Sequence, residues 1–504
     1  HIKKRRNHMK LPILIAMVLY MAMVIWIGVI YSKKTKTSED YFLGGRGLGP
    51  WVTAMSAEAS DMSSWLLMGL PGLAYATGFS QAGWTAIGLI LGTYLNWKIV
   101  AKRLRHYTEV ADNAITVPDF FSNRFKDDKK ILSSISAIMI LIFFTVYTAS
   151  GFAACGTLFN SVFGLNYQKS MIVCAIVIVL YTSMGGFLAA STTDLIQGLL
   201  MSFAIVIVLI VGVVNAGGVA NVIAHGQAME GFFDVMKYHD PATGDAVSQG
   251  VIPILSGLAW GLGYMGMPHI LIRYISIKSE KEMKKSRIVG TCWTGIILVM
   301  ASVVGMVGLK YLGGGLTDNS QVFIRLVRGV FPALVAGILL SAILAASMST
   351  ADSQLLASSS AFSSDVYKPI FRKSASDKEM LWAGRIVVII ISVVALAIAM
   401  NPDCEGIMAL VSNAWGAFGS AFGPVIVLSL YWKRLNYNGA LASIIVGFAV
   451  DMLWYKFLAT PTGLYEIVPG FAAAFITAIV VSLLTKKPDD KVVEIFEKAK
   501  LPTE

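Results

Sequence analysis

Thirteen stretches of the sequence are apolar over the roughly 20 residues that a helix needs to cross a lipid bilayer. Hydrophobic residues make up 56% of the 504 residues and charged residues only 14%, whereas a soluble domain carries about 25% charged residues. We therefore predict an all-α, polytopic membrane protein that is embedded in lipid. The predicted spans cover residues 11–31, 49–77, 80–101, 131–160, 167–189, 191–216, 249–275, 287–312, 329–364, 380–400, 404–431, 438–458 and 464–485.

The distribution of Lys and Arg predicts the orientation, because these residues accumulate in cytoplasmic loops. Most of the 41 Lys and Arg residues follow odd-numbered spans. The C-terminus would then lie inside the cell and the N-terminus outside. The net charge of +11 is explained by this topology and does not indicate a nucleic-acid partner. The loops after even-numbered spans hold only Lys169, Lys237, Lys310, Arg325, Arg328 and Lys456.

The first ten residues, HIKKRRNHMK, are strongly basic and disagree with an N-terminus outside the membrane. Either the first apolar run does not span the membrane, or the residues before Met9 do not belong to the natural chain. We favour the second interpretation. The longest polar stretches are residues 102–130, residues 217–248 and the tail after Leu484, which argues against an added catalytic or signalling domain.

Two predicted spans carry residues that interrupt helices. The second contains Glu58 and Asp61 among serines, followed by GLPG at residues 69–72, and the seventh reads SGLAWGLGYMGMPH at residues 256–269. A glycine costs a helix about 1 kcal/mol and a proline about 3 kcal/mol, and an Asp in mid-bilayer costs about 2.5–3.5 kcal/mol. We predict that both helices are broken where they face a cavity. Close helix packing at the glycines is the alternative.

The two breaks lie five spans apart, which is typical of transporters built from two inverted repeats, with ion and substrate sites at the broken helices. We predict a basic tail, a first peripheral helix with its loop, two repeats, two further peripheral helices and a cytoplasmic tail. These parts cover residues 1–10, 11–48, 49–216, 249–431, 432–485 and 486–504.

The ninth span presents two neighbouring hydroxyl groups on one helical face. Ala346, Ser349 and Thr350 are spaced three and four residues apart, so they share that face. Two hydroxyl oxygens there would suit a cation. The alternative is that each hydroxyl bonds to the carbonyl group four residues earlier in its own helix.

Several longer motifs lie along the chain: SDMSSWLLMGLPG, FFTVYTASG, YTSMGGFLA, WGLGYMGMPHIL, AGILLSAILAASMST and WGAFGSAFGPV. Together they resemble the sodium/solute symporter family, over nearly the whole chain from Asp40 to Phe471. The resemblance implies about thirteen transmembrane helices with a leucine-transporter-type core in a bacterial inner membrane. It also implies Na⁺-coupled uptake of L-proline by alternating access, with no cofactor besides Na⁺.

The resemblance also implies the ligands of Na⁺, which are carbonyl groups at the first break and groups on the ninth span. Na⁺ is a hard cation, and a broken helix supplies neutral carbonyl oxygens to it. No carboxylate belongs to this set, which favours Na⁺ over a proton. On this chain the ligands are Ala59, Met62, Ala346, Ser349 and Thr350.

The substrate pocket implied by the resemblance is rich in aromatic residues. No Arg or Lys lies near the breaks, so the carboxylate of proline would meet a helix N-terminus, a hydroxyl group or Na⁺. Its ammonium group would lie over an aromatic face. The pocket residues are Ser63, Trp65, Tyr147, Trp260, Tyr264 and Pro268.

Four further charged residues fit more than one role or depart from the family pattern. We expect Asp61 to stabilise the cation from behind its ligands, or to cap a half-helix that begins near Met62. Asp194 resembles a family position near the inner end of the sodium path, but it equally fits a helix N-cap. Arg46 resembles the arginine of a family motif, GGR, near the cytoplasmic face. Glu58 departs from the family and would face water or pair with a basic residue.

Other functions remain open at this point. The solute could be another small amino acid or a carboxylate. A channel would need a continuous polar lining, whereas the polar residues concentrate in one layer. An intramembrane enzyme would need a nucleophile with its base, or an HExxH motif, and we find neither. The four cysteines are scattered and indicate no disulfide or metal site: Cys155, Cys174, Cys292 and Cys404.

Overall fold

The computed structural model describes residues 2–33, 35, 37–401 and 406–500, and of residues 2–9 the backbone alone. Cys404 and the last four residues of the predicted tail therefore lie outside the described residues. The elements in chain order are α1 (Ile2–Ser32), α2 (Ser38–Leu43), η1 (Gly44–Arg46), α3 (Pro50–Asp61), η2 (Ser64–Leu66), α4 (Gly69–Thr77), α5 (Phe79–Leu95), η3 (Asn96–Ala101), α6 (Lys102–Val110), α7 (Val117–Phe125), α8 (Ile131–Phe163), α9 (Tyr167–Asn215), α10 (Val219–Gln227), β1 (Lys237–His239), β2 (Ala246–Ser248), α11 (Val251–Ala259), η4 (Trp260–Met265), α12 (Pro268–Ser276), η5 (Glu280–Glu282), α13 (Met283–Leu312), η6 (Asn319–Gln321), α14 (Val322–Val330), α15 (Ala333–Ala361), η7 (Phe362–Phe371), α16 (Asp377–Met400), α17 (Ile407–Tyr431), α18 (Tyr437–Phe457), α19 (Ala459–Thr462), α20 (Ile467–Leu484) and α21 (Asp490–Lys498).

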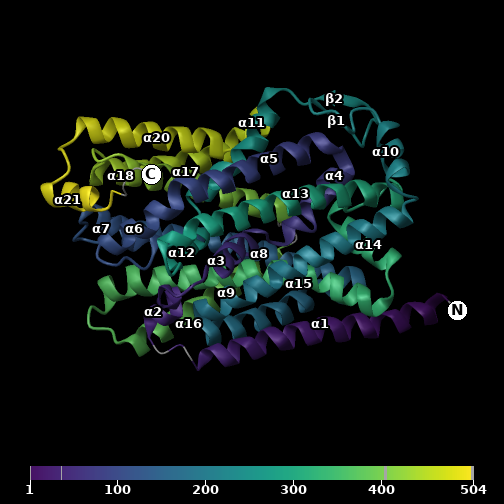
Figure 1. The fold of residues 1–504 in the computed structure, drawn as a ribbon, viewed down its shortest axis with the longest axis horizontal. Helices are drawn as coiled ribbons and strands as arrows, with labels where there is room; N and C mark the ends of the chain where they lie inside the picture. The colour runs from purple at the N-terminus through teal and green to yellow at the C-terminus, as the bar shows by residue number, and fades with distance from the viewer. Residues whose placement is uncertain (1, 34, 36, 402–405, 501–504) are drawn as a thin grey trace.

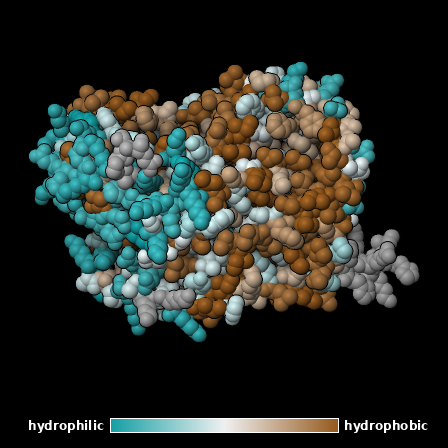
Figure 2. All heavy atoms as spheres, viewed as in Figure 1, coloured by the Kyte–Doolittle hydropathy of each residue, from teal (hydrophilic) through white to brown (hydrophobic). Residues whose placement is uncertain are grey.

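The helices run mostly along the long direction of one bundle (Figure 1). The N-terminus, α10 and the two strands lie at one end, which we call the N-terminal end. The helices α6, α7 and α21 lie at the opposite end, which we call the C-terminal end. Figure 2 shows hydrophobic residues over the middle of the visible face and hydrophilic residues gathered over the C-terminal end. This distribution is that of a protein embedded in a membrane.

Among the described residues, nine helices are long and apolar enough to cross a membrane. The number is ten if the pair formed by residues 251–265 and 268–276, bent by 46°, counts as one span. The prediction of a helical, polytopic membrane protein is confirmed, while the count of thirteen spans stays a prediction. The extended structure in the described part consists of the antiparallel pair β1–β2 and an isolated bridge between Leu48 and Ile277.

The 49-residue helix α9 is divided at Gly186, where the prediction placed the end of one span and the start of another. A straight helix of this length would be about 73 Å long. Gly186 has φ 62° and ψ −161°, which is not helical and favours glycine. A Cβ at this residue would lie 2.8 Å from the Tyr41 ring, so the turn also needs the space that glycine leaves.

Both predicted interruptions are present. The helix α3 ends at Asp61, and the chain passes through Met62 and the short η2 before α4 begins. The helix α11 passes through the 3₁₀ segment η4 before α12 begins at Pro268, where proline starts a helix without losing a hydrogen bond. The glycines of the second break also serve packing, because a Cβ on Gly92 of α5 would clash with the backbone of Gly261. The two interpretations of these glycines are therefore both correct.

Candidate functional site

The first break is joined to the ninth predicted span by a side-chain hydrogen bond. The Ser349 hydroxyl of α15 donates to the carbonyl oxygen of Ala59 at 2.9 Å and lies 3.2 Å from that of Ala346. Two other hydroxyls of α15 bond within their own helix, Ser341 to Gly337 at 2.8 Å and Ser347 to Ile343 at 2.9 Å. Ser349 is thus directed across the helix interface, which brings three of the five predicted sodium ligands together.

Thr350 and Met62 complete the set predicted to bind Na⁺. The Thr350 hydroxyl is buried and has no hydrogen-bond partner among the described residues, which is the state expected of an oxygen kept for a ligand. Met62 is fully buried at the end of α3, where its ψ of 69° takes its carbonyl group out of the helical direction. The neutral oxygens at this place fit the chemistry of Na⁺.

Asp61 connects the two broken helices to one another. Its Oδ2 accepts a hydrogen bond from the Tyr264 hydroxyl of η4 at 2.6 Å. Asp61 is the last residue of α3, and it is Ser63 whose side chain caps η2 by accepting from the Trp65 amide at 3.5 Å. The alternative in which Asp61 caps the next half-helix is therefore wrong, because the next helical segment begins at Ser64, two residues later than that alternative requires.

A layer of aromatic rings lies next to this connection. Trp260 stacks on Tyr465 with ring centres 5.2 Å apart, and its ring lies 6.4 Å from those of Trp65 and Trp415. Tyr264 meets Trp415 edge to face at 5.0 Å, and Trp415 Nε1 donates to the Trp260 carbonyl oxygen at 2.8 Å. We call these five residues the aromatic layer.

Sequence reasoning placed Trp65, Trp260 and Tyr264 in this layer but missed Trp415 and Tyr465. Both missed residues lie inside motifs of the resemblance, yet neither is near a break in the sequence. The other predicted pocket residues are more peripheral. Tyr147 of α8 is buried and faces Ser63 and Asp61. Pro268 is buried as the first residue of α12.

A second polar network lies one helical turn from the predicted sodium ligands, toward the C-terminal end. Arg273 Nη2 donates to Asp194 Oδ2 at 3.1 Å and also to the Ser353 hydroxyl. The Ser56 hydroxyl donates to Asp194 Oδ2 at 2.6 Å, and Arg273 Nε to Ser56 Oγ at 3.0 Å. These residues connect α3, α9, α12 and α15, and all are buried.

This network corrects two expectations. An arginine does follow the second break, but it pairs with Asp194 and is committed there. Asp194 lies inside α9, eight residues after the bend at Gly186, so it caps no helix. Arg273 was missed because an arginine beside an apolar run is usually assigned to the membrane boundary. Its burial depends on a carboxylate that is distant in the sequence.

Glu58 and Arg46 both serve contacts outside the ion and substrate sites. Glu58 accepts from Trp97 Nε1 at 2.7 Å and from the Thr294 hydroxyl at 2.9 Å. It is buried, so the expectation that it faces water or pairs with a basic residue is wrong. Arg46 donates to the carbonyl oxygens of Ala114 and Ile275, each at 2.9 Å. Partial burial lowers the pKa of Arg46 to about 10. This pKa is still well above neutral pH, so the side chain stays charged.

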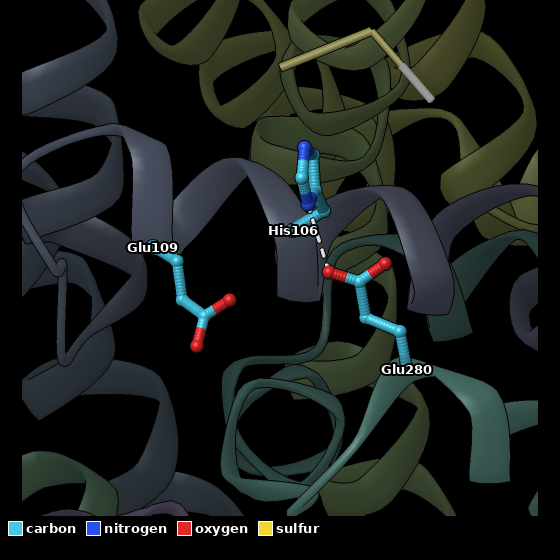
Figure 3. A group of neighbouring side chains, drawn as sticks. All are labelled: His106, Glu109 and Glu280. Atoms are coloured by element: carbon cyan, nitrogen blue, oxygen red, sulfur yellow. Dashed lines mark hydrogen bonds and ion pairs between the residues drawn. The ribbon is translucent and has the colours of Figure 1, made fainter. Parts of the chain in front are cut away.

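Among the described residues, one cluster has the ligand types of a transition-metal site. Figure 3 shows His106 and Glu109 of α6 with Glu280 of η5, at the C-terminal end of the bundle. His106 Nδ1 lies 2.8 Å from Glu280 Oε1, while Glu109 Oε1 pairs with Arg105 at 2.7 Å. Because Glu109 already has a cation partner, we interpret the cluster as a hydrogen-bonded contact between α6 and η5.

A cavity of about 730 Å³ opens toward the N-terminal end, on the far side of the first break from the Arg273 network. It reaches Met68 and Gly69, directly beyond η2, and is bounded by the start of α17 at Met408. A solute of the size of an amino acid fits this volume. The site is thus approached by open space from one end of the bundle and closed by a buried ion pair toward the other.

Comparison with known proteins agrees with this geometry. The sequence pattern of the Sodium:solute symporter family matches residues 41–447. The chain is 47% identical over 486 residues to the osmoregulated proline transporter OpuE of Bacillus subtilis (strain 168), which covers 95% of this chain and 96% of that protein. It is also 44% identical over 496 residues to the sodium/proline symporter of Escherichia coli (strain K12). The aligned region covers 97% of this chain and 96% of that protein.

The fold is similar to that of a Na⁺-coupled sialic acid symporter in its substrate-bound outward-open state, with a TM-score of 0.78 and 21% identity, over 95% of this chain and 99% of that one. The fold is therefore of the leucine-transporter type with two broken helices, and the family match and the relatives define the protein as a membrane transporter. The chain belongs to the Sodium:solute symporter family. It is a transporter and not an enzyme.

Proposed function

We propose that this protein takes up L-proline together with Na⁺ across a bacterial inner membrane by alternating access. The observation that carries the proposal is the hydrogen bond from Ser349 of α15 to Ala59 at the break of α3. It places hydroxyl and carbonyl oxygens together beside the aromatic layer. Two relatives that are 44–47% identical over nearly the whole chain are named as proline transporters, which supports the choice of solute.

In the proposed mechanism Na⁺ binds the carbonyl oxygens of Ala59, Met62 and Ala346 and the hydroxyls of Ser349 and Thr350. Because these groups belong to α3 and α15, binding ties the broken helix to its neighbour. The free hydroxyl of Thr350 is available to the ion without loss of an existing bond. The membrane potential drives the ion inward with about 2.3 kcal/mol per charge per 100 mV.

L-Proline would bind on the other side of the first break, against the aromatic layer. Its ring packs on Trp65 and Trp260, and its ammonium group lies over an aromatic face, which is worth about 2 kcal/mol when desolvated. The amide groups at the start of η2 offer hydrogen bonds to its carboxylate. Ser63, Tyr147, Tyr264 and Pro268 complete the proposed pocket.

Alternating access follows from the asymmetry of the two ends. We propose thirteen membrane crossings, with repeats over residues 49–216 and 249–431 and with peripheral segments before and after them. The excess of Lys and Arg at the C-terminal end would place that end in the cytoplasm and the N-terminus outside. The cavity at Met68 then admits solute from outside, while the pair Arg273–Asp194 closes the cytoplasmic exit.

The test is uptake of labelled proline into proteoliposomes that contain the purified protein, with and without an inward Na⁺ gradient. We expect uptake that depends on Na⁺ and counterflow when unlabelled proline is loaded inside. Uptake without counterflow would indicate a channel. Competition of unlabelled amino acids and carboxylates with labelled proline identifies the preferred solute. If another compound competes better than unlabelled proline, that compound replaces proline as the proposed solute.

A further inference from the structure

A second cavity, of about 720 Å³, opens at the C-terminal end, outside the proposed ion and substrate sites. It lies between the loop that joins α7 to α8 and the segment that joins α15 to α16. That segment begins with the π-helix η7, which packs against α7, α8 and α16. Because η7 continues α15, the cavity lies at the end of the helix that carries the proposed sodium ligands. We call this cavity the basic groove.

Lysines from both walls line the basic groove and outnumber its carboxylates. Asp119 Oδ1 lies 3.7 Å from Lys130 Nζ, so these two charges largely offset one another. For the other three lysines no ion pair is found within the described part of the chain. The groove therefore keeps an excess of positive charge. The four lysines are Lys129 and Lys130 of the α7–α8 loop, Lys368 of η7 and Lys373 directly after η7.

The basic groove has apolar surroundings that are open to the outside of the bundle. Ile370 lines the groove and is exposed, and Phe371 beside it is exposed as well. Trp382, in the second turn of α16, is also exposed, and tryptophan is typical of the boundary between a membrane and water. Lysine charges next to exposed apolar side chains suit a ligand that is anionic at one end and apolar at the other.

We propose that the basic groove binds the headgroup of an anionic phospholipid that carries hydroxyl groups. The lysine ammonium groups pair with the phosphodiester, and the acyl chains pass over Ile370 and Phe371. Asp128 also lines the groove, and its carboxylate accepts from the headgroup hydroxyls. The hydroxyl of Ser364, a further lining residue, has no hydrogen-bond partner among the described residues. Because two carboxylates lie in the groove, a singly charged phosphodiester fits it better than a more highly charged anion.

The bound headgroup ties η7 to the α7–α8 loop, which belong to different proposed repeats. The lipid therefore holds the end of α15 in place and stabilises the folded protein. The proposed orientation puts the groove at the cytoplasmic leaflet, where basic segments meet anionic lipids. The binding itself depends neither on that orientation nor on proline uptake, so it can be tested without transport.

Thermal unfolding of the purified protein in detergent, followed by tryptophan fluorescence, measures the binding. Short-chain phosphatidylglycerol is titrated, with phosphatidylcholine and inorganic phosphate in parallel. We expect phosphatidylglycerol to raise the unfolding temperature saturably and the other two to leave it nearly unchanged. An equal rise with phosphatidylcholine would overturn a site that selects charge. An equal rise with inorganic phosphate would show a site for a soluble anion in place of a lipid.

The phosphatidylglycerol concentration that gives half of the temperature rise is then compared among variants. Lys129→Gln, Lys368→Gln and Lys373→Gln should each raise it about fivefold, the effect of one lysine close to an anionic lipid. Lys491→Gln is the matched control, because it makes the same charge change on α21, outside the groove. Wild-type values in the groove variants, or an equal increase in the control, would refute the site. Since the lysines belong to two separate walls, misfolding of one variant leaves another to decide.

Discussion

Single side chains decide which groups the proposed ion site offers, because the structure uses nearly identical hydroxyls of α15 in different ways. Ser347 bonds to its own helix, Ser349 reaches Ala59, and Thr350 has no partner among the described residues. Position on the helical face explains the difference, since only Ser349 and Thr350 are on the side that meets the break. The role of each hydroxyl of α15 therefore depends on which group of the neighbouring helix faces it.

Thr350→Ala should raise the Na⁺ concentration for half-maximal proline uptake about tenfold or more, because a lost ligand of a charged group costs about 1.5–3 kcal/mol. Initial rates of uptake against Na⁺ concentration measure the effect. Ser347→Ala is the matched control, since its hydroxyl is engaged within α15. An unchanged Na⁺ dependence of Thr350→Ala, at normal protein levels, would show that the sodium ligands are wrongly assigned.

Trp260→Ala and Tyr264→Ala should weaken proline binding strongly, while Na⁺ binding in the absence of proline stays measurable. Trp260 contributes a ring to the pocket, and Tyr264 holds Asp61 through its hydroxyl. Equilibrium binding of labelled proline and of Na⁺ to the purified variants separates the two effects. Trp382→Ala, which removes an exposed ring on α16, is the control. Equal loss of both ligands would indicate damage to the fold and no pocket at this place.

At the scale of elements, the proposed transport site is formed where two helices end inside the bundle. Backbone groups at the ends of α3 and α11 lack their helical hydrogen bonds, and α15 supplies hydroxyls to the end of α3. Toward the C-terminal end, one turn from the proposed ion ligands, Arg273 of α12 and Asp194 of α9 tie α3 and α15 together through Ser56 and Ser353. Opening this end therefore requires that a buried ion pair separate.

Arg273→Met should destabilise the protein by about 3–5 kcal/mol, because Asp194 is left as a buried charge without a cation. The double variant Arg273→Met with Asp194→Asn should regain a large part of that loss. Thermal unfolding in detergent, followed by tryptophan fluorescence, measures both. Additive effects of the two substitutions would contradict the coupling that the 3.1 Å contact implies.

At the scale of the whole molecule, the bundle has one strongly hydrophilic end (Figure 2). That end carries α6, α7 and α21, whose loops hold many of the Lys and Arg residues. The opposite end carries the β1–β2 pair and the cavity next to the first break. We propose on this basis that solute enters from the N-terminal end and leaves at the C-terminal end.

The proposed orientation is tested by single cysteines that react with a membrane-impermeant maleimide in intact cells. Lys237→Cys in β1 should react from outside, and Lys491→Cys in α21 should react only after the membrane is permeabilised. Native Cys292, which is exposed on α13, and Cys404, which lies outside the described residues, are first replaced by serine to remove the background. Reaction of both positions from the same side, or the reverse pattern, would refute the orientation and with it the direction of uptake.

Much of the architecture could be predicted from the sequence alone. The apolar runs predicted a polytopic helical protein, and the glycines with Pro268 predicted the break at η4, because backbone cost is a local property of the residues. The face shared by Ser349 and Thr350 was also predictable, since it follows from helical spacing. The structure adds that the glycines of the second break serve close packing as well.

The contacts of charged residues, in contrast, were decided only by the tertiary structure. Asp194 and Arg273 are 79 residues apart in sequence, and Glu58 finds donors on η3 and α13. Sequence reasoning proposed an ion-path role or a helix cap for Asp194, expected Glu58 to face water or pair with a basic residue, and gave Arg273 no role. A buried charge is stable only with a partner of matching geometry, and that partner comes from another helix. The composition and spacing of this chain therefore determine where its helices span and break, while long-range packing decides which polar groups meet inside the bundle.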